Sequence, residues 1–299
     1  MIDGSIVTAI GARLTSALAA PAGTFIPLQV GATAAGWLDP ARADRLAAFA
    51  GTFDARAGAI ALSPGLADEP ARTAALDRVS RALAAEGRLT AWRDERYAVA
   101  AEFGAPPLFL LERAAARYFG ILTFAAHVNG LVDGGSGLRM WLARRSPTKA
   151  IDPGQLDNLV GGGIAARQSV AATVVKEAWE EAGIPEALAA TATSAGVLHI
   201  CRAQADGLQR ETIFVHDLWL PAEFAPAGQD GEAVEHRLVP LAEAARLISL
   251  TAGPDVVTAD ASLVVLDCLL RRGAIAADAP AYLQLAALRH TRLAPAARR

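Results

Sequence analysis

Residues 161–184 read GGGIAARQSVAATVVKEAWEEAGI, and this stretch decides how the rest of the chain is interpreted. Between residues 169 and 182 the apolar side chains recur at helical spacing, and Gly183 is the residue type that commonly ends a helix. Three glutamates share one face of such a helix: Glu177, Glu180 and Glu181. The opposite face would pack against a sheet through Ala171, Val174, Val175, Ala178 and Ala182. The stretch therefore predicts an anchored helix that displays three carboxylates.

The acidic face of this helix needs a neutralising partner, because carboxylates one turn apart repel one another. A hard divalent cation can supply it, since Mg²⁺ prefers oxygen ligands and keeps several waters; Mn²⁺ is an alternative. Such an ion can polarise a diphosphate and supply hydroxide for attack on phosphorus. We therefore predict that Glu177, Glu180 and Glu181 are catalytic and metal-binding. The competing interpretation is an ordinary solvated helix face.

Glycine lies on both sides of the helix, which a solvated surface does not require. Gly161, Gly162 and Gly163 precede it, where bare backbone can approach a phosphate or lend a carbonyl oxygen to a metal. We predict that Gly161 and Gly162 contact the substrate. The glycines favour the functional interpretation of the acidic triplet.

The segments around this motif are typical of an α/β unit. Residues 119–128 and 138–144 are strand-like and are joined by a glycine-rich turn at 133–137, which predicts a hairpin. The remaining expected elements are strands at 195–202, 212–220 and 234–239, and helices at 240–249 and 260–272. The fold class expected for this part of the chain is therefore α/β with a mixed sheet.

The sequence pattern of residues 1–118 differs from that of the later segments and predicts a separate, smaller unit. It reads mainly as helices, with a short strand at 59–62; the expected helices are 41–49, 69–86 and a proline-started one at 106–118. We place a helical or α+β accessory domain at 1–118, the α/β domain at 119–285 and a C-terminal tail at 286–299.

Composition and charge exclude several classes of protein. The chain has 299 residues, 53% of them hydrophobic, and a formal net charge of −3. No basic field indicates a nucleic-acid partner, and no apolar run approaches the roughly 20 residues of a membrane span. The two cysteines, Cys201 and Cys268, have no zinc-like spacing and suggest neither a metal site nor a disulfide framework. We expect a cytoplasmic protein with a small-molecule partner, and the sequence leaves a homodimer open.

The motif resembles the signature of the Nudix hydrolase family. That signature runs Gly, five residues, Glu, seven residues, Arg-Glu, an aliphatic residue, any residue, Glu-Glu, any residue, Gly and an aliphatic residue. This chain matches it over residues 162–184, with Gln168 in place of the first glutamate and Lys176 in place of the arginine. Lysine can brace the glutamates as a point charge but lacks the planar fork of a guanidinium.

The resemblance implies a fold and a set of ligands. The fold would be a Nudix α/β/α sandwich with a mixed sheet. Glu177 and Glu181 would be direct metal ligands, Glu180 would lie close to the metal, and the carbonyl of Gly161 would be a further ligand. The activity would be magnesium-dependent cleavage of a diphosphate bond.

A narrower resemblance covers most of residues 105–285. The segments LDNLVGGG (156–163), KEAWEEAGI (176–184) and MWLARRSPTK (140–149) are similar to the Nudix branch related to thiamin pyrophosphokinase, which carries its own N-terminal domain. The resemblance implies a substrate of thiamin-diphosphate type, including damaged forms, cleaved to the monophosphate and phosphate. One departure is VVTAD (256–260), where that branch has a lysine-proline-asparagine stretch, so the resemblance implies no substrate contact there.

Further candidates lie in the loops around the motif. Glu232, in a loop between two expected strands, is a candidate general base or extra metal ligand, weighed evenly against a solvated carboxylate. Three basic residues that follow an expected strand could face a diphosphate: Arg144, Arg145 and Lys149. His127, at the end of a strand near the same edge, completes the predicted substrate-binding set.

Two other functions remain open at this point. Gln168 and Lys176 motivate a non-catalytic sensor that binds a diphosphate on a Nudix scaffold without turnover. A Nudix hydrolase of nucleoside-diphosphate derivatives is the second. Phosphate release from a panel of diphosphates would separate them.

Overall fold

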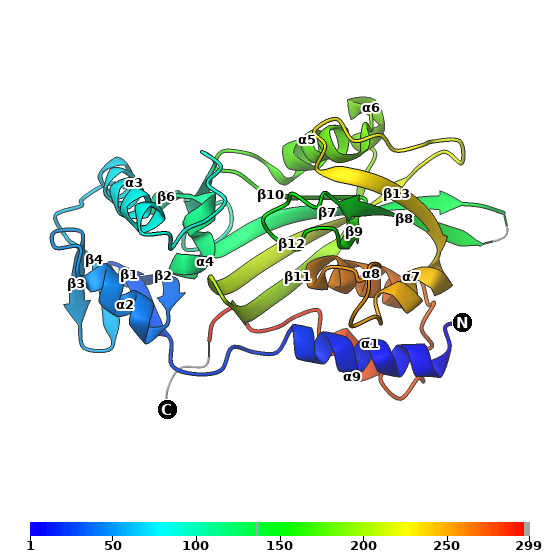
Figure 1. Ribbon diagram of the computed structural model, residues 1–299, viewed down its shortest axis with the longest axis horizontal. Helices are drawn as coiled ribbons and strands as arrows, with labels where there is room; N and C mark the ends of the chain where they lie inside the picture. The colour runs from blue at the N-terminus through cyan, green and yellow to red at the C-terminus, as the bar shows by residue number, and fades with distance from the viewer. Residues whose placement is uncertain (136, 296–299) are drawn as a thin grey trace.

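The computed structural model describes residues 1–135 and 137–295. An N-terminal unit, in blue and cyan, lies beside a larger unit built on one long sheet (Figure 1). Each unit has a hydrophobic core of its own, and the larger unit has one on each face of its sheet.

The N-terminal unit is α+β. Its sheet has the order β2-β1-β4-β3, with β1 (Ile26–Val30), β2 (Thr33–Leu38), β3 (Phe53–Arg56) and β4 (Ala59–Leu62). Two helices, α2 (Pro40–Ala47) and α3 (Glu69–Ala85), begin at aspartate N-caps followed by proline, a combination that favours helix starts. The strand predicted at 59–62 and the helix predicted at 69–86 are confirmed.

The helix predicted at 106–118 is wrong for residues 106–112, and only the end of the segment is helical. The chain forms β5 (Arg96–Val99) and β6 (Phe109–Glu112), which pair antiparallel. A 3₁₀ turn η1 (Arg113–Ala115) and the short helix α4 (Ala116–Phe119) follow. Phe109 and Leu111 are buried in the core of the unit. Burial of every second side chain favours a strand at this position, although helix-forming alanines follow it.

The larger unit has a mixed, seven-stranded sheet. The main order is β11-β12-β7-β8-β13, with β10 paired to β7 and β9 paired to β8. The bounds are β7 (Leu122–Asp133), β8 (Leu138–Arg145), β9 (Leu156–Asn158), β10 (Val160–Gly163), β11 (Thr193–Gln204), β12 (Gly207–Trp219) and β13 (Ala233–Pro240). Only β7 and β12 run parallel; the other pairs are antiparallel. The predicted hairpin is present as β7 and β8, although residue 136 of its turn lies outside the described residues.

Helices cover both faces of this sheet, so the unit is an α/β/α sandwich. The helix α5 (Val170–Ala182) packs on one face, with the short α6 (Glu186–Ala189) after it. The other face carries α7 (Leu241–Leu247) and α8 (Ala259–Arg271). Every residue of α8 from 261 to 270 is buried, because α7, α1 and the sheet surround it.

The first helix of the chain belongs to the core of the larger unit. Helix α1 (Gly4–Ala17) lies along α7 and α8 rather than beside the N-terminal sheet (Figure 1). Arg13 fixes it there by donating hydrogen bonds to the carbonyl of Ile248 (2.6 Å) and the hydroxyl of Ser262 (2.8 Å). At the other end of the chain, α9 (Tyr282–Ala287) packs against the same layer.

The helix of the motif forms as predicted, with one correction. Ser169 caps α5 by accepting a hydrogen bond from the Ala172 amide, and Gly183 ends it in the left-handed region at φ 63°. Val174, Ala178 and Ala182 are buried as expected. Ala171, in the first turn of the helix, is exposed, and Thr173 is buried.

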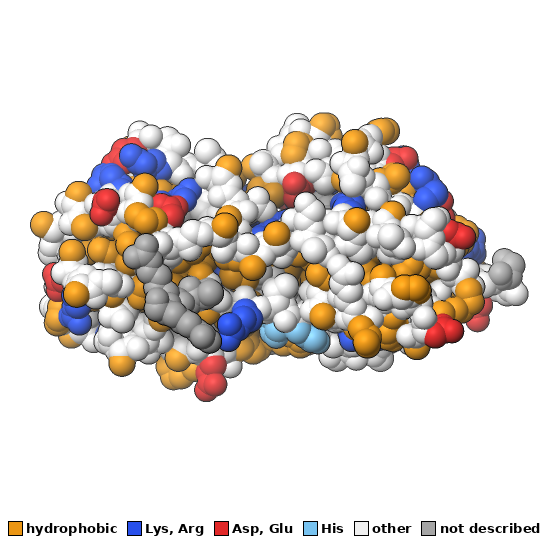
Figure 2. Space-filling model, turned by 90° about the horizontal axis from the view of Figure 1, so that it is seen from below, with side chains coloured by type: hydrophobic (Ala, Val, Ile, Leu, Met, Phe, Trp, Pro, Cys, Tyr) orange, Lys and Arg blue, Asp and Glu red, His pale blue; other side chains and the backbone are white. Residues whose placement is uncertain are grey.

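The face drawn in Figure 2 carries side chains of both charges. Acidic and basic side chains are interspersed over the face in Figure 2, where neither sign gathers into a broad field. Among the described helices none is both long enough and apolar enough to cross a lipid bilayer.

Candidate active site

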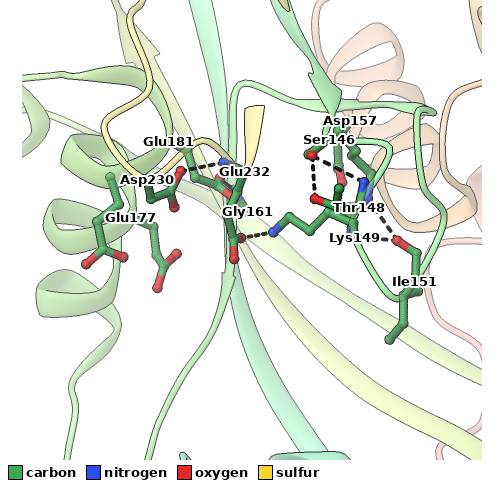
Figure 3. A network of polar contacts seen from close by, with 12 residues as sticks. Ser146, Thr148, Lys149, Ile151, Asp157, Gly161, Glu177, Glu181, Asp230 and Glu232 are labelled. Atoms are coloured by element: carbon green, nitrogen blue, oxygen red, sulfur yellow. Dashed lines mark hydrogen bonds and ion pairs between the residues drawn. The ribbon is translucent and has the colours of Figure 1, made fainter. Parts of the chain in front are cut away.

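A cavity of about 690 Å³ lies where the edge strand β10 meets α5, two loops and the N-terminal unit. Three alternate residues of β7 form part of its wall, since they share one face of the strand: Thr123, Ala125 and His127. Helix α5 contributes Lys176, Glu177, Glu180 and Glu181. Figure 3 shows the polar side chains around the β10 edge.

The three glycines of β10 each leave room for one side chain. A Cβ on Gly161 would lie 3.0 Å from the His127 ring, one on Gly162 would lie 2.5 Å from Cγ of Glu177, and one on Gly163 would lie 3.0 Å from Cζ of Tyr97. A larger residue at Gly162 or Gly163 would force the Glu177 or Tyr97 side chain to move, and one at Gly161 would require the His127 ring to give by a few tenths of an ångström. The glycine run therefore lets the acidic helix, a histidine and a tyrosine approach the strand on both of its faces.

Glu181 is the most deeply placed of the three glutamates. Its Oε2 accepts a hydrogen bond from the Gly161 amide at 2.8 Å, which ties α5 to β10. Burial raises the pKa of Glu181 to about 8, and the negative charges of Asp157 and Glu177 add to this, while the Gly161 amide and Lys149 oppose it. Burial and two neighbouring carboxylates therefore both disfavour the charged form of Glu181.

Lys176 braces the other two glutamates. Its Nζ lies 2.9 Å from Oε1 of Glu177 and 2.7 Å from Oε2 of Glu180. Lys176, which replaces the arginine of the signature, therefore lies where it can brace two glutamates, as predicted. Gln168, the other departure, is exposed and does not line the cavity.

The donor chemistry of this end fits a divalent cation. Five carboxylates line the cavity close to β10: Asp157, Glu177, Glu180, Glu181 and Asp230. They supply the hard oxygen ligands that Mg²⁺ and Mn²⁺ prefer. Within residues 1–135 and 137–295, no three or more acidic, histidine or cysteine side chains are already gathered at metal-binding spacing. We expected the three glutamates of α5 to converge on one point, and they do not. Glu177 and Glu180 form ion pairs with Lys176 instead.

Glu232 lies across the cavity from α5 and is held by two cations. Lys149 forms an ion pair with its Oε2, drawn in Figure 3, and Arg93 of the N-terminal unit lies 3.2 Å from its Oε1. The loop that carries it is fixed to the end of α5, because the Gln229 amide donates to the Glu180 carbonyl at 2.6 Å. The loop carboxylate predicted from the sequence therefore does face the α5 glutamates.

The structure brings most of the predicted substrate-binding residues together, but not Arg144. Arg145, Lys149, Gly161, Gly162 and His127 all line the cavity. His127 is 9% exposed, and its Nδ1 lies 2.8 Å from Oδ1 of Asn158.

Arg144 lies outside this cavity. Its guanidinium forms ion pairs with Glu235 and Asp255, both at 2.6 Å, and donates to the carbonyls of Gly154 (2.9 Å) and Pro254 (2.6 Å). Neighbouring residues of one strand point to opposite sides, which explains why Arg145 lines the cavity and Arg144 does not.

Several cavity residues were not identified from the sequence. Asp157 lies within the quoted LDNLVGGG segment, and Asp230 lies two residues before Glu232, so both had a local signal. Arg93, Tyr97 and Arg113 belong to the N-terminal unit and had none, because no spacing in the sequence relates them to the acidic helix.

Fold and site together define a Nudix-type hydrolase: an α/β/α sandwich in which a glycine-flanked acidic helix lines a polar cavity. The NUDIX domain model matches residues 123–260, and a domain of unknown function, DUF4743, matches residues 12–123. The chain is 37% identical to Nudix hydrolase 24, chloroplastic, of Arabidopsis thaliana, over 88% of this chain and 72% of that protein. It is 35% identical to Nudix hydrolase 20, chloroplastic, of the same plant, over 88% and 72%.

The chain therefore belongs to the Nudix hydrolase family, with an N-terminal DUF4743 region. Among solved structures, the NUDIX domain of Shewanella oneidensis NrtR complexed with ADP ribose is similar at 14% identity and a TM-score of 0.40. That match covers 52% of this chain and 90% of that one.

Proposed function

We propose that this Nudix hydrolase cleaves the diphosphate bond of a small organic diphosphate of thiamin-diphosphate type, with Mg²⁺ as its cofactor, to give a monophosphate and phosphate. The observation that carries the proposal is the presence of carboxylates and cationic side chains in one cavity. The carboxylates of α5 line it together with Lys149, which pairs with Glu232, and Arg145, which pairs with Asp157. The first set suits a divalent cation and the second suits phosphate oxygens.

The α5 residues would hold the cofactor. Glu177, Glu180 and Glu181 would be its side-chain ligands and the carbonyl of Gly161 a further one. When bound, Mg²⁺, or Mn²⁺ in its place, withdraws charge from phosphate oxygens and lowers the pKa of water. Lys176 would keep Glu177 and Glu180 oriented along the helix face.

The remaining residues would bind and orient the substrate. Lys149 and Arg145 would contact the diphosphate, and His127 would form part of the wall beside it. Glu232 would accept the proton of the attacking water. A diphosphate that binds Lys149 would compete with Glu232 for the lysine, and this exchange would free the carboxylate to act as a base.

Two observations support a substrate of thiamin-diphosphate type. The segments LDNLVGGG and KEAWEEAGI, whose likeness to the thiamin-pyrophosphokinase-related branch suggested this substrate, form the wall of the cavity. Carboxylates outside α5 also line the cavity: Asp152, Glu211 and Asp260, the last of them paired with Arg202. A carboxylate of this set would accept a hydrogen bond from an amino group of the heterocycle.

A substrate panel tests the proposal. Purified protein with Mg²⁺ would be assayed for phosphate release from thiamin diphosphate and its oxidised and oxygen-substituted analogues. ADP-ribose, a nucleotide sugar and coenzyme A would be assayed by chromatography of the two organic monophosphates, because cleavage of their diphosphate bond releases no phosphate. We expect the thiamin-type compounds to give the highest kcat/KM. A preference for a nucleotide compound would contradict the substrate assignment, and tight binding without any turnover would indicate a diphosphate sensor.

A further inference from the structure

The N-terminal unit is docked firmly beside the site. The Ala166 amide, in the loop that follows β10, donates a hydrogen bond to the Arg96 carbonyl of β5 at 2.8 Å. The Phe103 ring packs on two rings of the central sheet, at centroid distances of 4.7 Å from Phe124 and 4.8 Å from Phe214. Side chains on β5 and at the end of β6 are therefore held in fixed positions relative to the glycine strand.

The side chains of this unit that line the cavity include Arg93, Tyr97 and Arg113. Tyr97 is only 7% exposed, and its hydroxyl lies over Gly163, where a Cβ would overlap it. Among the described residues no side chain or backbone group forms a hydrogen bond with this hydroxyl. A hydroxyl on a largely buried ring that has no partner among the described residues and reaches a cavity is available to a ligand.

Arg113 follows β6 and lies beside Tyr97. Its guanidinium carbon is 5.9 Å from the centroid of the Tyr97 ring, and its side chain is 40% exposed. The Nη1 atom of Arg113 donates a hydrogen bond to the carboxylate of Glu95 at 2.6 Å. The other donors of the guanidinium have no partner among the described residues. Because a guanidinium has donors and no acceptor, it cannot ligate a metal, and its natural ligand in this cavity is an anion.

Charge at this wall complements the acidic helix. Burial raises the pKa of Tyr97 to about 12, opposed by Arg113 and reinforced by Glu211, Glu95 and Glu177, so the hydroxyl keeps its proton at neutral pH. Burial acts to lower the pKa of Arg113, but Tyr97, Glu95 and Glu177 raise it above its usual value. Both side chains therefore remain hydrogen-bond donors close to the glutamate that is a predicted metal ligand.

We propose that Tyr97 and Arg113 bind the phosphate groups of the substrate, so that the N-terminal unit forms one wall of the substrate site. The hydroxyl of Tyr97 donates a hydrogen bond to a phosphate oxygen over Gly163, and the free edge of the Arg113 guanidinium neutralises phosphate charge. This inference rests on the proposed function, because it takes the anion to be the organic diphosphate. It gives the DUF4743 region a direct part in substrate recognition.

Two variants and two matched controls test the inference. Tyr97→Phe removes only the hydroxyl and keeps the buried ring, and Arg113→Gln removes the charge. Tyr118→Phe is the control for the first, since the Tyr118 hydroxyl is buried without a partner and does not line the cavity. Arg96→Gln is the control for the second, since Arg96 lies on the adjacent strand, is 44% exposed and faces Asp77 instead. Arg93 is not used, because its removal would also release Glu232.

Turnover and binding are measured separately. With the best substrate of the panel, we expect KM to rise about tenfold or more in Tyr97→Phe and Arg113→Gln, because each loses a hydrogen bond to a charged group. We expect kcat to change less than threefold, and Arg113→Lys to recover part of the loss. Affinity for methylenediphosphonate with Mg²⁺, measured by calorimetry, should fall by a similar factor. Both controls should remain within twofold of the wild type.

The outcomes separate this inference from the proposed function. If the wild type hydrolyses a diphosphate but Tyr97→Phe and Arg113→Gln keep its KM, the inference is overturned and the proposed function stands. If the wild type hydrolyses nothing, the proposed function fails, and calorimetry alone decides whether the two residues bind phosphate. A fall in melting temperature with unchanged KM and probe affinity would assign both side chains to packing alone.

Discussion

Substituting alanine for Gly162 should disable the site while leaving the fold in place. Gly162 lies in β10 opposite α5, and a Cβ there would lie 2.5 Å from Cγ of Glu177. Carbon atoms in ordinary contact are about 3.5 Å apart, so the Glu177 side chain must shift by about 1 Å. A displacement of that size in a catalytic group can lower the rate about 100-fold. We therefore expect kcat/KM to fall by about two orders of magnitude.

The assay is phosphate release with Mg²⁺, accompanied by thermal unfolding. Gly4→Ala is the matched control, because a Cβ on Gly4 meets no atom within 4 Å. The control should keep wild-type activity, and Gly162→Ala should unfold within a few degrees of the wild type. Wild-type kcat and KM in a folded Gly162→Ala protein would show that the position of Glu177 does not matter, and the reasoning from the glycine strand would be refuted.

Three further predictions concern other parts of the larger unit. Asp217 is 4% exposed and accepts from Arg271 at 2.7 Å; burial acts to raise its pKa, but Arg271 and its other donors hold it below the usual value. Asp217→Asn should lower the free energy of unfolding by about 3 kcal/mol in urea titrations at pH 7. This stabilisation is present above the unfolded pKa, about 4, and is lost as pH falls through the folded pKa, so the variant and the wild type should converge in strong acid. Arg144→Ala should lower the melting temperature and leave KM within twofold, because the guanidinium is engaged by Asp255 and Glu235; a tenfold rise in KM would restore its predicted substrate role. Glu232→Gln should lower kcat about 100-fold with a smaller effect on KM, and an unchanged pH–rate profile would remove it as the base.

The acidic helix and the sheet around it could be predicted because their signals are local. The apolar spacing of residues 170–182, the Ser169 cap and Gly183 each act within a few residues, and the helix forms with those bounds. Glu177, Glu180 and Glu181 line one cavity for the same reason, since helix geometry fixes which side chains share a face.

The N-terminal half could be predicted less well, because its contacts are decided at long range. Residues 109–112 form a strand through pairing with residues 96–99, and neither segment shows that pairing on its own. Helix α1 joins the core of the larger unit through Ile248 and Ser262, more than two hundred residues away. Tyr97 and Arg113 reach the cavity only because of this docking, so no motif could have indicated them.

The ion pairs of the site also depend on the folded arrangement. Arg144 and Arg145 are adjacent and chemically identical, but strand alternation sends only Arg145 to the cavity. The partners of Arg144 are Glu235 on β13 and Asp255 in the loop before α8, which the sequence does not relate to it. The sequence shows that the two arginines are neighbours, but it does not show which of them lines the cavity.

The central claim is that the α5 carboxylates hold a divalent cation that hydrolysis requires, and Glu181→Gln tests it most directly. The measurement pairs Mg²⁺ titration by calorimetry with phosphate release from the best substrate of the panel. We expect the variant to remain folded, to bind Mg²⁺ more weakly and to lose about 100-fold or more in kcat, as when a charge-stabilising group is removed from an active site. Equal Mg²⁺ affinity and equal turnover in the variant and the wild type would contradict the account.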